Sequence, residues 1–355
     1  MAAPMQNYSG GTFLTDLVTR PDFLQYIQEA IYNECKWIQS GAVVRDNALD
    51  ARRGGVKVQV PFFKPIDPTE SVIESNSTWG GGGGFLVPQK ITGDQQVMPI
   101  LHRGFAYAVD DLSRLGTGSD PMAAIRNQLA QAINKLRSST LISMYQGMFD
   151  TALATNTYDV SQAVSGASTA SNYLSAAAVV GAKHKLGERA DELKIIAMHS
   201  DVYAYLQQVG ALTFSANSLA SGQAIQWGGG GIGVRSDDIA WFMGLRVIVD
   251  DMLAPTLNVG GADQYPVYLC ADGCIAEGVQ QELRIEAERN ILSKQDVLSV
   301  DYHYGFHVFG TNYSGADNPT NGNLSTAGNW DMVYDTSKMV WTTQLIVNTP
   351  FSVNT

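Results

Sequence analysis

The sequence predicts an α+β fold in which one long helix supports extended strands and a separate compact section of alternating helices and strands. Three patterns lead to this prediction. About thirty residues near the middle repeat apolar side chains at helical spacing, stretches on both sides alternate with a period of two, and short helical and strand patterns follow one another between them. With 355 residues, the chain is long enough for several domains and a substantial core.

The long helix is expected over residues 120–153. Asp120 suits the N-cap, and Pro121 suits the first helical position, where its missing N–H is not needed. No glycine or proline follows before Gly147, so the helix would be a rod of roughly 45 Å. Such a rod is typical of a structural backbone, and an ordinary core helix is the alternative. Its recurring apolar residues are Met122, Ile125, Leu129, Ile133, Leu136, Leu141, Met144 and Met148.

An arm and a shorter helix are expected at the N-terminal end. Residues 1–20 are polar and contain glycine, which is typical of an arm without regular structure. Pro21 then opens a helix that Gly41 ends. Cys35 lies on the apolar face of this helix, so we expect it to be buried rather than reactive.

A long β-hairpin is predicted between the two helices. Residues 56–60 alternate between valine and polar side chains, and a matching apolar stretch runs from Val97 to Val109. The connecting segment, residues 64–92, includes a run of consecutive glycines at 80–84 and cannot form a core of its own. A two-stranded hairpin is marginal in water, and ordering each residue costs about 1–2 kcal/mol. We therefore expect a neighbouring subunit to hold this segment.

An α/β section and two late strands are expected after the long helix. A polar stretch at residues 154–172 leads into it, and a flexible stretch that runs to Gly233 precedes the strand Arg246–Val249. The late strand at 297–309 alternates over an unusual length, with His303 and His307 on the same side. The elements expected here are helix Ser175–Leu186, strand Leu193–Met198, helix Ser200–Val209, strand Arg246–Val249, strands at 264–269 and 276–279 around a turn at Asp272-Gly273, strand 297–309 and a last strand at 339–347.

Composition excludes several classes of function. Net charge is −11, so a phosphate-neutralising stripe is not expected. Charged residues make up 16% of the chain, against about 25% in typical soluble domains, which indicates a large core or much surface covered by partners. Three cysteines are too few for a disulfide framework, and no apolar run is long enough to span a membrane.

No motif in the chain supports catalysis or a bound cofactor. Residues 228–233 match the Gly-x-Gly-x-x-Gly dinucleotide pattern, but they lack the preceding strand and following helix that the pattern requires. Cys270 and Cys274 lie across a turn without a second ligand pair, so we expect two small core residues rather than a zinc site. His303 and His307 are interpreted as hydrogen-bonded or surface histidines, not metal ligands.

Several short stretches in the second half resemble tailed-phage major capsid proteins. They occur in the expected order and extend over most of residues 190–350. The first half agrees in layout, with an arm, an extended hairpin and a long helix before a compact domain. The matching stretches are Ile195–Leu206 (strand, His-Ser, short helix), Gly244–Asp251 (strand and acidic pair), 265–276 (hairpin), 286–290, 297–309 and Asn329-Trp330.

The resemblance implies the Hong Kong 97-type capsid fold. That fold has an N-terminal arm, an extended β-hairpin loop, a spine helix in a peripheral domain, and an α/β axial domain. The implied divisions are residues 1–50 (arm and first helix), 51–110 (extended loop), 111–171 (peripheral domain with spine helix 120–153), 172–295 (axial domain) and 296–355 (strands returning to the peripheral domain).

The function implied is that of a major capsid protein, which self-assembles into the icosahedral head shell of a tailed double-stranded DNA phage and encloses its genome. Implied partners are other copies of the chain in hexamers and pentamers, a separate scaffolding protein, a portal and, optionally, a decoration protein. The acidic chain would touch packaged DNA weakly if at all, and no membrane is involved. Assembly would occur in the host cytoplasm, and the protein would reside in the virion.

Two alternatives remain open at this point. An encapsulin-like cellular compartment shares the fold, and a nucleotide-dependent enzyme would use Gly228–Gly233. Lys64 and Lys90 flank the extended loop, but no lysine–asparagine crosslink matches particular positions, so none is predicted. No cofactor and no metal are expected. The residues predicted to contact neighbouring subunits are the apolar side chains on or beside that loop: Phe62, Phe63, Trp79, Phe85 and Leu86.

Overall fold

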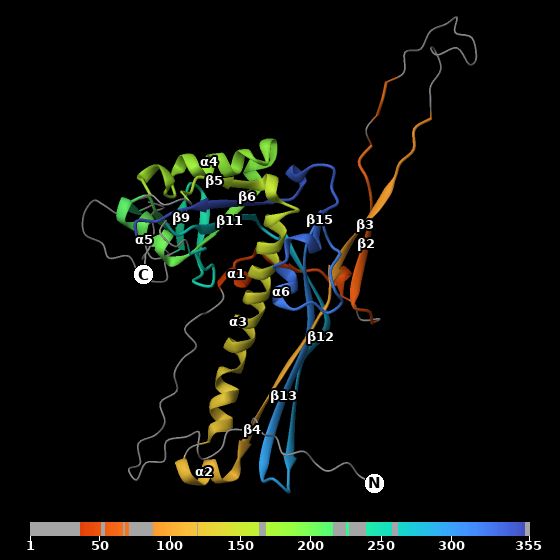
Figure 1. Cartoon of the computed structure of the whole chain (residues 1–355), viewed down its shortest axis with the longest axis vertical. Coiled ribbons are helices and arrows are strands. Elements are labelled where there is room, and N and C mark those ends of the chain that lie inside the picture. The colour runs from red at the N-terminus through yellow and green to blue at the C-terminus, as the bar shows by residue number, and fades with distance from the viewer. Residues whose placement is uncertain are drawn as a thin grey trace, which may run out of the picture.

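The computed structural model describes residues 36–50, 54–66, 68–70, 88–118, 120–162, 168–215, 225–226, 239–257 and 262–351. Two sheets and one long helix organise the chain (Figure 1). An eight-stranded sheet lies in a compact unit, a four-stranded sheet extends away from it in one direction, and a two-stranded hairpin projects in another (Figure 1).

Helix α3 (Pro121–Asp150) forms as the sequence predicts. The Asp120 side chain accepts a hydrogen bond from the Met122 N–H at 3.2 Å, and Pro121 occupies the first turn. The helix ends at Asp150, three residues earlier than expected, where the Leu153 N–H bonds back to the Met148 carbonyl at 2.8 Å. Leu153 is nevertheless fully buried, so the segment after the helix still belongs to the core.

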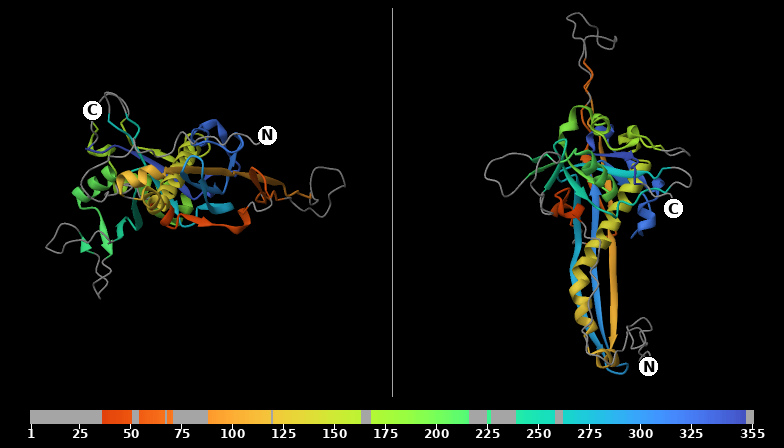
Figure 2. Two further views of the ribbon diagram at one scale, coloured as in Figure 1. Left: turned by 90° about the horizontal axis from the view of Figure 1, so that it is seen from below. Right: turned by 90° about the vertical axis from the view of Figure 1, so that its left-hand side faces the viewer.

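The four-stranded sheet carries α3 along one face (Figure 2). The alternation predicted at 297–309 is confirmed, because every second side chain of β13 from Val300 to Val308 is buried in the same core as α3. β12 and β13 are long antiparallel partners, and β4 pairs with the other edge of β13. The strand order is β1 (Val43–Arg45), β12 (Ile275–Asn290), β13 (Gln295–Val308) and β4 (Leu101–Asp110).

The eight-stranded sheet is covered on both faces. Helices α4 (Ala176–His184) and α5 (Ser200–Val209) pack on one face in a separate core, and the last turns of α3 pack on the other. The predictions of strand 193–198 and helix 200–209 are confirmed residue for residue. The strand order is β5 (Thr157–Asp159), β16 (Thr342–Val347), β11 (Tyr265–Ala271), β6 (Leu193–Met198), β10 (Leu245–Val249), β9 (Ile239–Phe242), β7 (Thr213–Ser215) and β8 (Ile225–Gln226).

Helix α3 joins the two sheets through a single core. Tyr145 and Phe149 near its end surround Tyr268 of β11, with ring centroids 5.2 and 5.5 Å away. Trp37 stacks on the same tyrosine at 5.4 Å, and it belongs to α1 (Lys36–Gln39) at the start of the described chain. The core around α3 therefore includes side chains from both sheets.

The remaining elements are short. Strands β2 (Lys57–Phe63) and β3 (Gly93–Pro99) form the hairpin, and β14 (Thr311–Tyr313) pairs with β15 (Trp330–Met332). The other helical turns are α2 (Asp111–Thr117), α6 (Asn321–Leu324), and the 3-10 turns Asn47–Leu49, Ala154–Asn156, Ala170–Asn172, Gly187–Glu192, Ala327–Asn329 and Ser337–Met339.

Two strand predictions are wrong in their pairing and one in its length. The stretch 97–109 is not one hairpin strand: β3 ends at Pro99, and β4 pairs with β13 from Leu101 to Asp110, with Leu101, Ala108 and Val109 buried. The strands around the turn at Asp272-Gly273 are not a hairpin, since the turn carries the chain from β11 in one sheet to β12 in the other. β12 also continues to Asn290, well beyond the expected end at residue 279.

The predicted last strand forms as β16 in the eight-stranded sheet. β16 pairs with β11 and β5, and Leu345 and Val347 fill the core beneath α4 and α5. The helix predicted from Pro21 lies outside the described residues up to position 35, as do Cys35 and the Gly228–Gly233 pattern. The five-part domain division stays a prediction. None of the described helices combines the length and apolarity that crossing a membrane requires.

Candidate assembly surfaces

The hairpin forms an arm with exposed apolar side chains. Seven register pairs join β2 to β3, from Lys57↔Pro99 to Phe63↔Gly93, and the arm points away from the rest of the chain (Figure 1). Phe63 is 77% exposed, and Ile66 and Ile91 beyond it are also exposed. Monomeric proteins rarely leave such side chains together on a projecting element, so the arm has the composition of a contact surface.

The base of the arm rests on two glycines of the four-stranded sheet. Gly278 of β12 and Gly305 of β13 lie directly opposite each other. A Cβ atom on Gly278 would lie 2.9 Å from Met98 Cε, and one on Gly305 would lie 2.6 Å from the Pro99 carbonyl oxygen. We call this contact the hairpin seat: Gln96, Met98 and Pro99 on β3, facing Gly278, Gly305 and His307. Only residues without side chains let the arm approach this closely.

A buried polar group completes the seat. The Gln96 side-chain oxygen accepts a hydrogen bond from the Gly310 N–H at 2.9 Å and lies 2.9 Å from His307 Nε2. Its amide nitrogen donates to the Tyr334 hydroxyl at 3.2 Å. His307 is fully buried, and this burial lowers its pKa to about 4, so it is neutral near pH 7.

The structure places only two of the five predicted contact residues. Phe62 is half-buried and packs edge-on against Tyr334 of the same chain, with ring centroids 5.4 Å apart. Phe63, next to it, points to the other face of the arm and is exposed. Trp79, Phe85 and Leu86 lie outside the described residues. The assignment of these five residues to a subunit interface stays a prediction.

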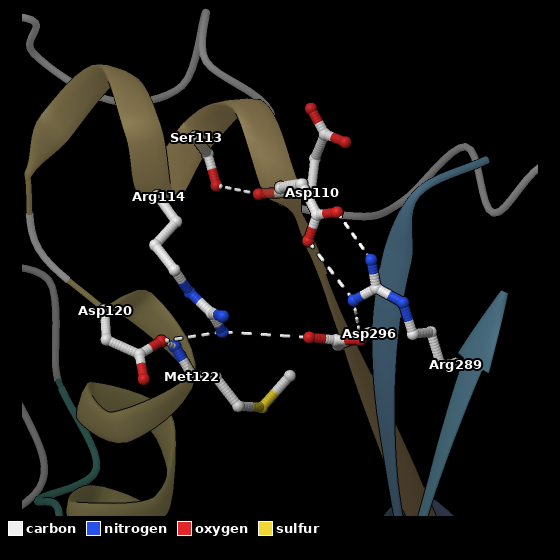
Figure 3. Close-up of polar contacts among 8 residues, drawn as sticks. Asp110, Ser113, Arg114, Asp120, Met122, Arg289 and Asp296 are labelled. Carbon is white, nitrogen blue, oxygen red and sulfur yellow. Dashed lines mark hydrogen bonds and ion pairs between the residues drawn. The ribbon is translucent and has the colours of Figure 1, made fainter. Parts of the chain in front are cut away.

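The far end of the four-stranded sheet is held together by an ion-pair network (Figure 3). Arg289 of β12 contacts both carboxylate oxygens of Asp111, at 2.6 and 3.3 Å, and reaches Asp296 at 2.8 Å. The Arg289 guanidinium lowers the pKa of Asp111. Arg114 lies 3.1 Å from Asp120 and 3.7 Å from Asp296. Helix α2, the start of α3 and the β12–β13 turn are thereby joined into one unit.

This unit presents a second exposed apolar surface, which the sequence reasoning missed. Four large aliphatic side chains lie on it with exposed fractions between 62% and 80%. The backbone fixes their relative position, since the Asp111 N–H donates to the Lys294 carbonyl at 3.0 Å. The only sequence signal was an apolar pair inside a strongly charged stretch. We call this the tip surface: Leu112, Leu115, Ile291 and Leu292.

No catalytic or metal-binding cluster emerges among the described residues. They contain no group of three or more His, Cys, Asp or Glu side chains arranged to hold a metal ion. Cys270 and Cys274 are buried free thiols, each 3.8 Å from the Tyr145 hydroxyl, which agrees with their prediction as core residues. The features that stand out among the described residues are the exposed apolar surfaces of the arm and the tip.

Solved capsid structures share this fold. The cyanophage Pam1 capsid asymmetric unit superimposes with a TM-score of 0.58 at 12% identity, covering 94% of this chain and 98% of that one. The capsid of Ralstonia phage GP4 gives a TM-score of 0.58 at 9% identity, with the same coverage of 94% and 98%. The class of fold is therefore the Hong Kong 97-like capsid fold.

Sequence comparison gives the family. A model described as "Major capsid protein 13-like" (Gp13-like) matches residues 106–340. The major capsid protein of Bacillus phage SPP1 is 28% identical over 339 residues, covering 92% of this chain and 96% of the relative. The chain belongs to the Gp13-like family of major capsid proteins. The predicted fold and the predicted role as a capsid protein that assembles with itself into a shell are confirmed.

Proposed function

We propose that this chain builds the icosahedral head of a tailed double-stranded DNA phage from hexamers and pentamers, with each hairpin arm lying over a neighbouring subunit. One observation carries the proposal: the arm exposes Phe63, Ile66 and Ile91 and has only two strands. Burying one such side chain contributes about 1.5–3 kcal/mol. A neighbouring copy that covers the arm would thus stabilise both the arm and the shell.

The role is purely structural in this proposal. The shell encloses the genome without gripping it, because the chain carries a net charge of −11 and repels phosphate. A separate scaffolding protein and a portal take part in assembly, which takes place in the host cytoplasm, and a decoration protein is an optional partner. No enzymatic activity is part of this proposal.

Charging the arm should block assembly. Phe63→Asp combined with Ile66→Asp places two carboxylates where apolar area would be buried, so we expect folded, soluble subunits that form no shells. Sedimentation and negative-stain imaging measure assembly, and circular dichroism checks folding. Gln59→Asp is the matched control, since it adds a carboxylate at an exposed polar position of the same arm. Normal shell yield from the double variant would refute the role of the arm.

The tip surface is proposed as a second contact between subunits. It lies at the opposite end of the longest axis from the arm (Figure 1), and a closed shell needs contacts in more than one direction. Leu115→Asp with Leu292→Asp should therefore leave small assemblies intact but prevent closed shells. Size-exclusion chromatography with light scattering distinguishes the two stages, and Glu288→Gln on the neighbouring strand is the control. Closed shells from the double variant would assign the tip no part in assembly.

A further inference from the structure

Three of the five histidines lie at the junction between the hairpin and the four-stranded sheet. His102 is the second residue of β4, while His303 and His307 lie on β13, on either side of the seat glycine Gly305. The seven-residue segment 96–102 contains His102 and contacts the other two histidines: Gln96 bonds to His307, and His102 is the partner of His303. Between them, Pro99 covers Gly305.

His307 cannot accept a proton while the seat is closed. Its Nε2 atom shares the Gln96 oxygen with the Gly310 N–H, so the neutral ring donates its one N–H there. Its Nδ1 atom is buried without a hydrogen-bond partner among the described residues. A second proton on Nδ1 would add a buried charge and an N–H with no acceptor. Protonation therefore requires the segment 96–102 to move away and admit water.

His102 and His303 form a second proton-sensitive contact. They are directly opposite in the β4–β13 register, and their ring centroids are 4.4 Å apart. His102 Nε2 lies 2.9 Å from the Gln280 side-chain oxygen, and the Gln280 amide donates to the Gly55 carbonyl at 3.0 Å, just before β2. Partial burial and the neighbouring His102 lower the pKa of His303. A proton on His303 would place a charge in a partly buried site beside the His102 ring.

The surrounding charges do not cancel the lowering of the pKa of His303. On β13, Asp301 faces His303 and partly opposes the lowering of its pKa. Arg284 lies opposite Asp301 on β12, and Arg103 of β4 donates to the Pro319 carbonyl at 2.5 Å. On β2, Lys57 pairs with Asp317 at 3.0 Å. Around His307 the partners are Gln96, Gly310 and the Phe309 ring, and burial alone shifts its pKa.

We propose that the hairpin seat is a proton-sensitive joint: acid protonates His307 and His303 and releases residues 96–102 from β13, while the eight-stranded sheet and the rest of the four-stranded sheet stay folded. The proposal concerns the single chain and does not depend on where the arm docks. Opening frees Gln96 from His307 and unpairs the first two residues of β4, Leu101 and His102, from β13. The position of the arm then depends on pH.

The direction and size of the effect of pH on opening follow from the difference in proton binding between the closed and open joint. The pKa of His307 is depressed in the closed joint, so the closed form binds fewer protons than the open one. Its stability is fully present above pH 6.5 and declines as the pH falls towards 4. With a pKa of 6.5 when open and about 4 when closed, lowering the pH from 7.5 to 5 raises the opening constant roughly 30-fold.

Hydrogen–deuterium exchange of the full chain tests the joint. After correction for intrinsic exchange rates, peptides that cover residues 96–102 should lose protection roughly 30-fold between pH 7.5 and 5, while β6 and β11 should keep theirs. His307→Gln keeps a donor to Gln96 but cannot be protonated near neutral pH, so it should abolish most of this response. Combining it with His102→Gln and His303→Gln should abolish the rest.

The exchange experiment has a control variant, and three outcomes would contradict the proposal. His184→Gln, at an exposed position on α4, should leave the acid response unchanged. Should the triple variant fail to fold at pH 7.5, His307→Gln alone carries the test. The proposal is overturned if residues 96–102 keep their protection at pH 5, if His307→Gln responds like the native chain, or if β6 and β11 lose protection together with residues 96–102.

Discussion

Replacing Gly147 by alanine should destabilise the folded subunit by about 2–4 kcal/mol, although alanine is the better helix former by about 1 kcal/mol. Gly147 lies in α3 where the segment 321–330 crosses the helix. A Cβ atom there would collide with the Leu324 carbonyl oxygen and would lie 2.9 Å from Trp330 Nε1. Those two atoms are already joined by a 2.7 Å hydrogen bond, and both residues are 1% exposed. The backbone itself would have to move.

Urea denaturation of the soluble subunit measures the change in the free energy of unfolding, and the dependence of that free energy on urea concentration checks for two-state behaviour. Gly328→Ala is the matched control, because it lies in the same crossing segment and a Cβ atom there meets nothing within 4 Å. The control should change the free energy of unfolding little. If Gly147→Ala proved neutral or stabilising, the close approach of α3 to residues 321–330 would be wrong.

Removing Glu277 should destabilise the subunit by about 2–4 kcal/mol, since it leaves the Arg137 guanidinium without its counter-charge. Arg137 of α3 hydrogen-bonds to Glu277 of β12, and their side chains are only 22% and 14% exposed. The guanidinium also lies 5.6 and 5.9 Å from the ring centroids of Tyr304 and Phe306. This pair is the main charged contact between the helix and the long sheet among the described residues.

A double-mutant cycle measures the coupling energy between Arg137 and Glu277 apart from their other contacts. Glu277→Gln, Arg137→Met and the combination are compared by urea denaturation, and the double variant should be more stable than Glu277→Gln alone. The exposed pair Arg284–Glu286 on the same strand is the reference and should give no measurable coupling. Equal coupling energies for the two pairs would contradict a special role for Arg137 and Glu277.

The sequence allowed good predictions where structure is set locally. The Asp120-Pro121 start of α3 and the strand and helix at 193–209 depend on caps and periodicity within a few residues, and all were correct. Strand pairing was predicted less well because it depends on distant partners. Nothing near Ile100 indicates that the chain leaves one strand partner for another, and the charged stretch at 280–290 is held extended by β13.

For the candidate assembly surfaces, too, features set by neighbouring residues could be predicted, and features set by distant residues could not. Phe63 could be selected because it ends an alternating strand beside a glycine-rich loop. The hairpin seat could not be predicted, because it depends on the pairing of two glycines that are far apart in sequence, Gly278 of β12 and Gly305 of β13. The tip surface could not be predicted either, because it depends on the ion pair by which Arg289 joins α2 to the β12–β13 turn. Distances between residues remote in sequence decide both features, and no local pattern contains them.

The route of the chain through its two sheets has a consequence for biosynthesis. Strands β1 and β4 of the four-stranded sheet come first, the eight-stranded sheet follows from β5 to β11, the chain returns for β12 and β13, and β16 finally pairs with β11. A ribosome must therefore complete residues 342–347 before the edge of β11 is covered. Until then β11 of the nascent chain has an unpaired edge, because its partner strand β16 has not been synthesised. Folding is therefore slow, and the unpaired edge can pair with other copies of the chain. Chaperone demand should thus peak late in translation, and truncation before residue 342 should yield aggregates instead of shortened subunits.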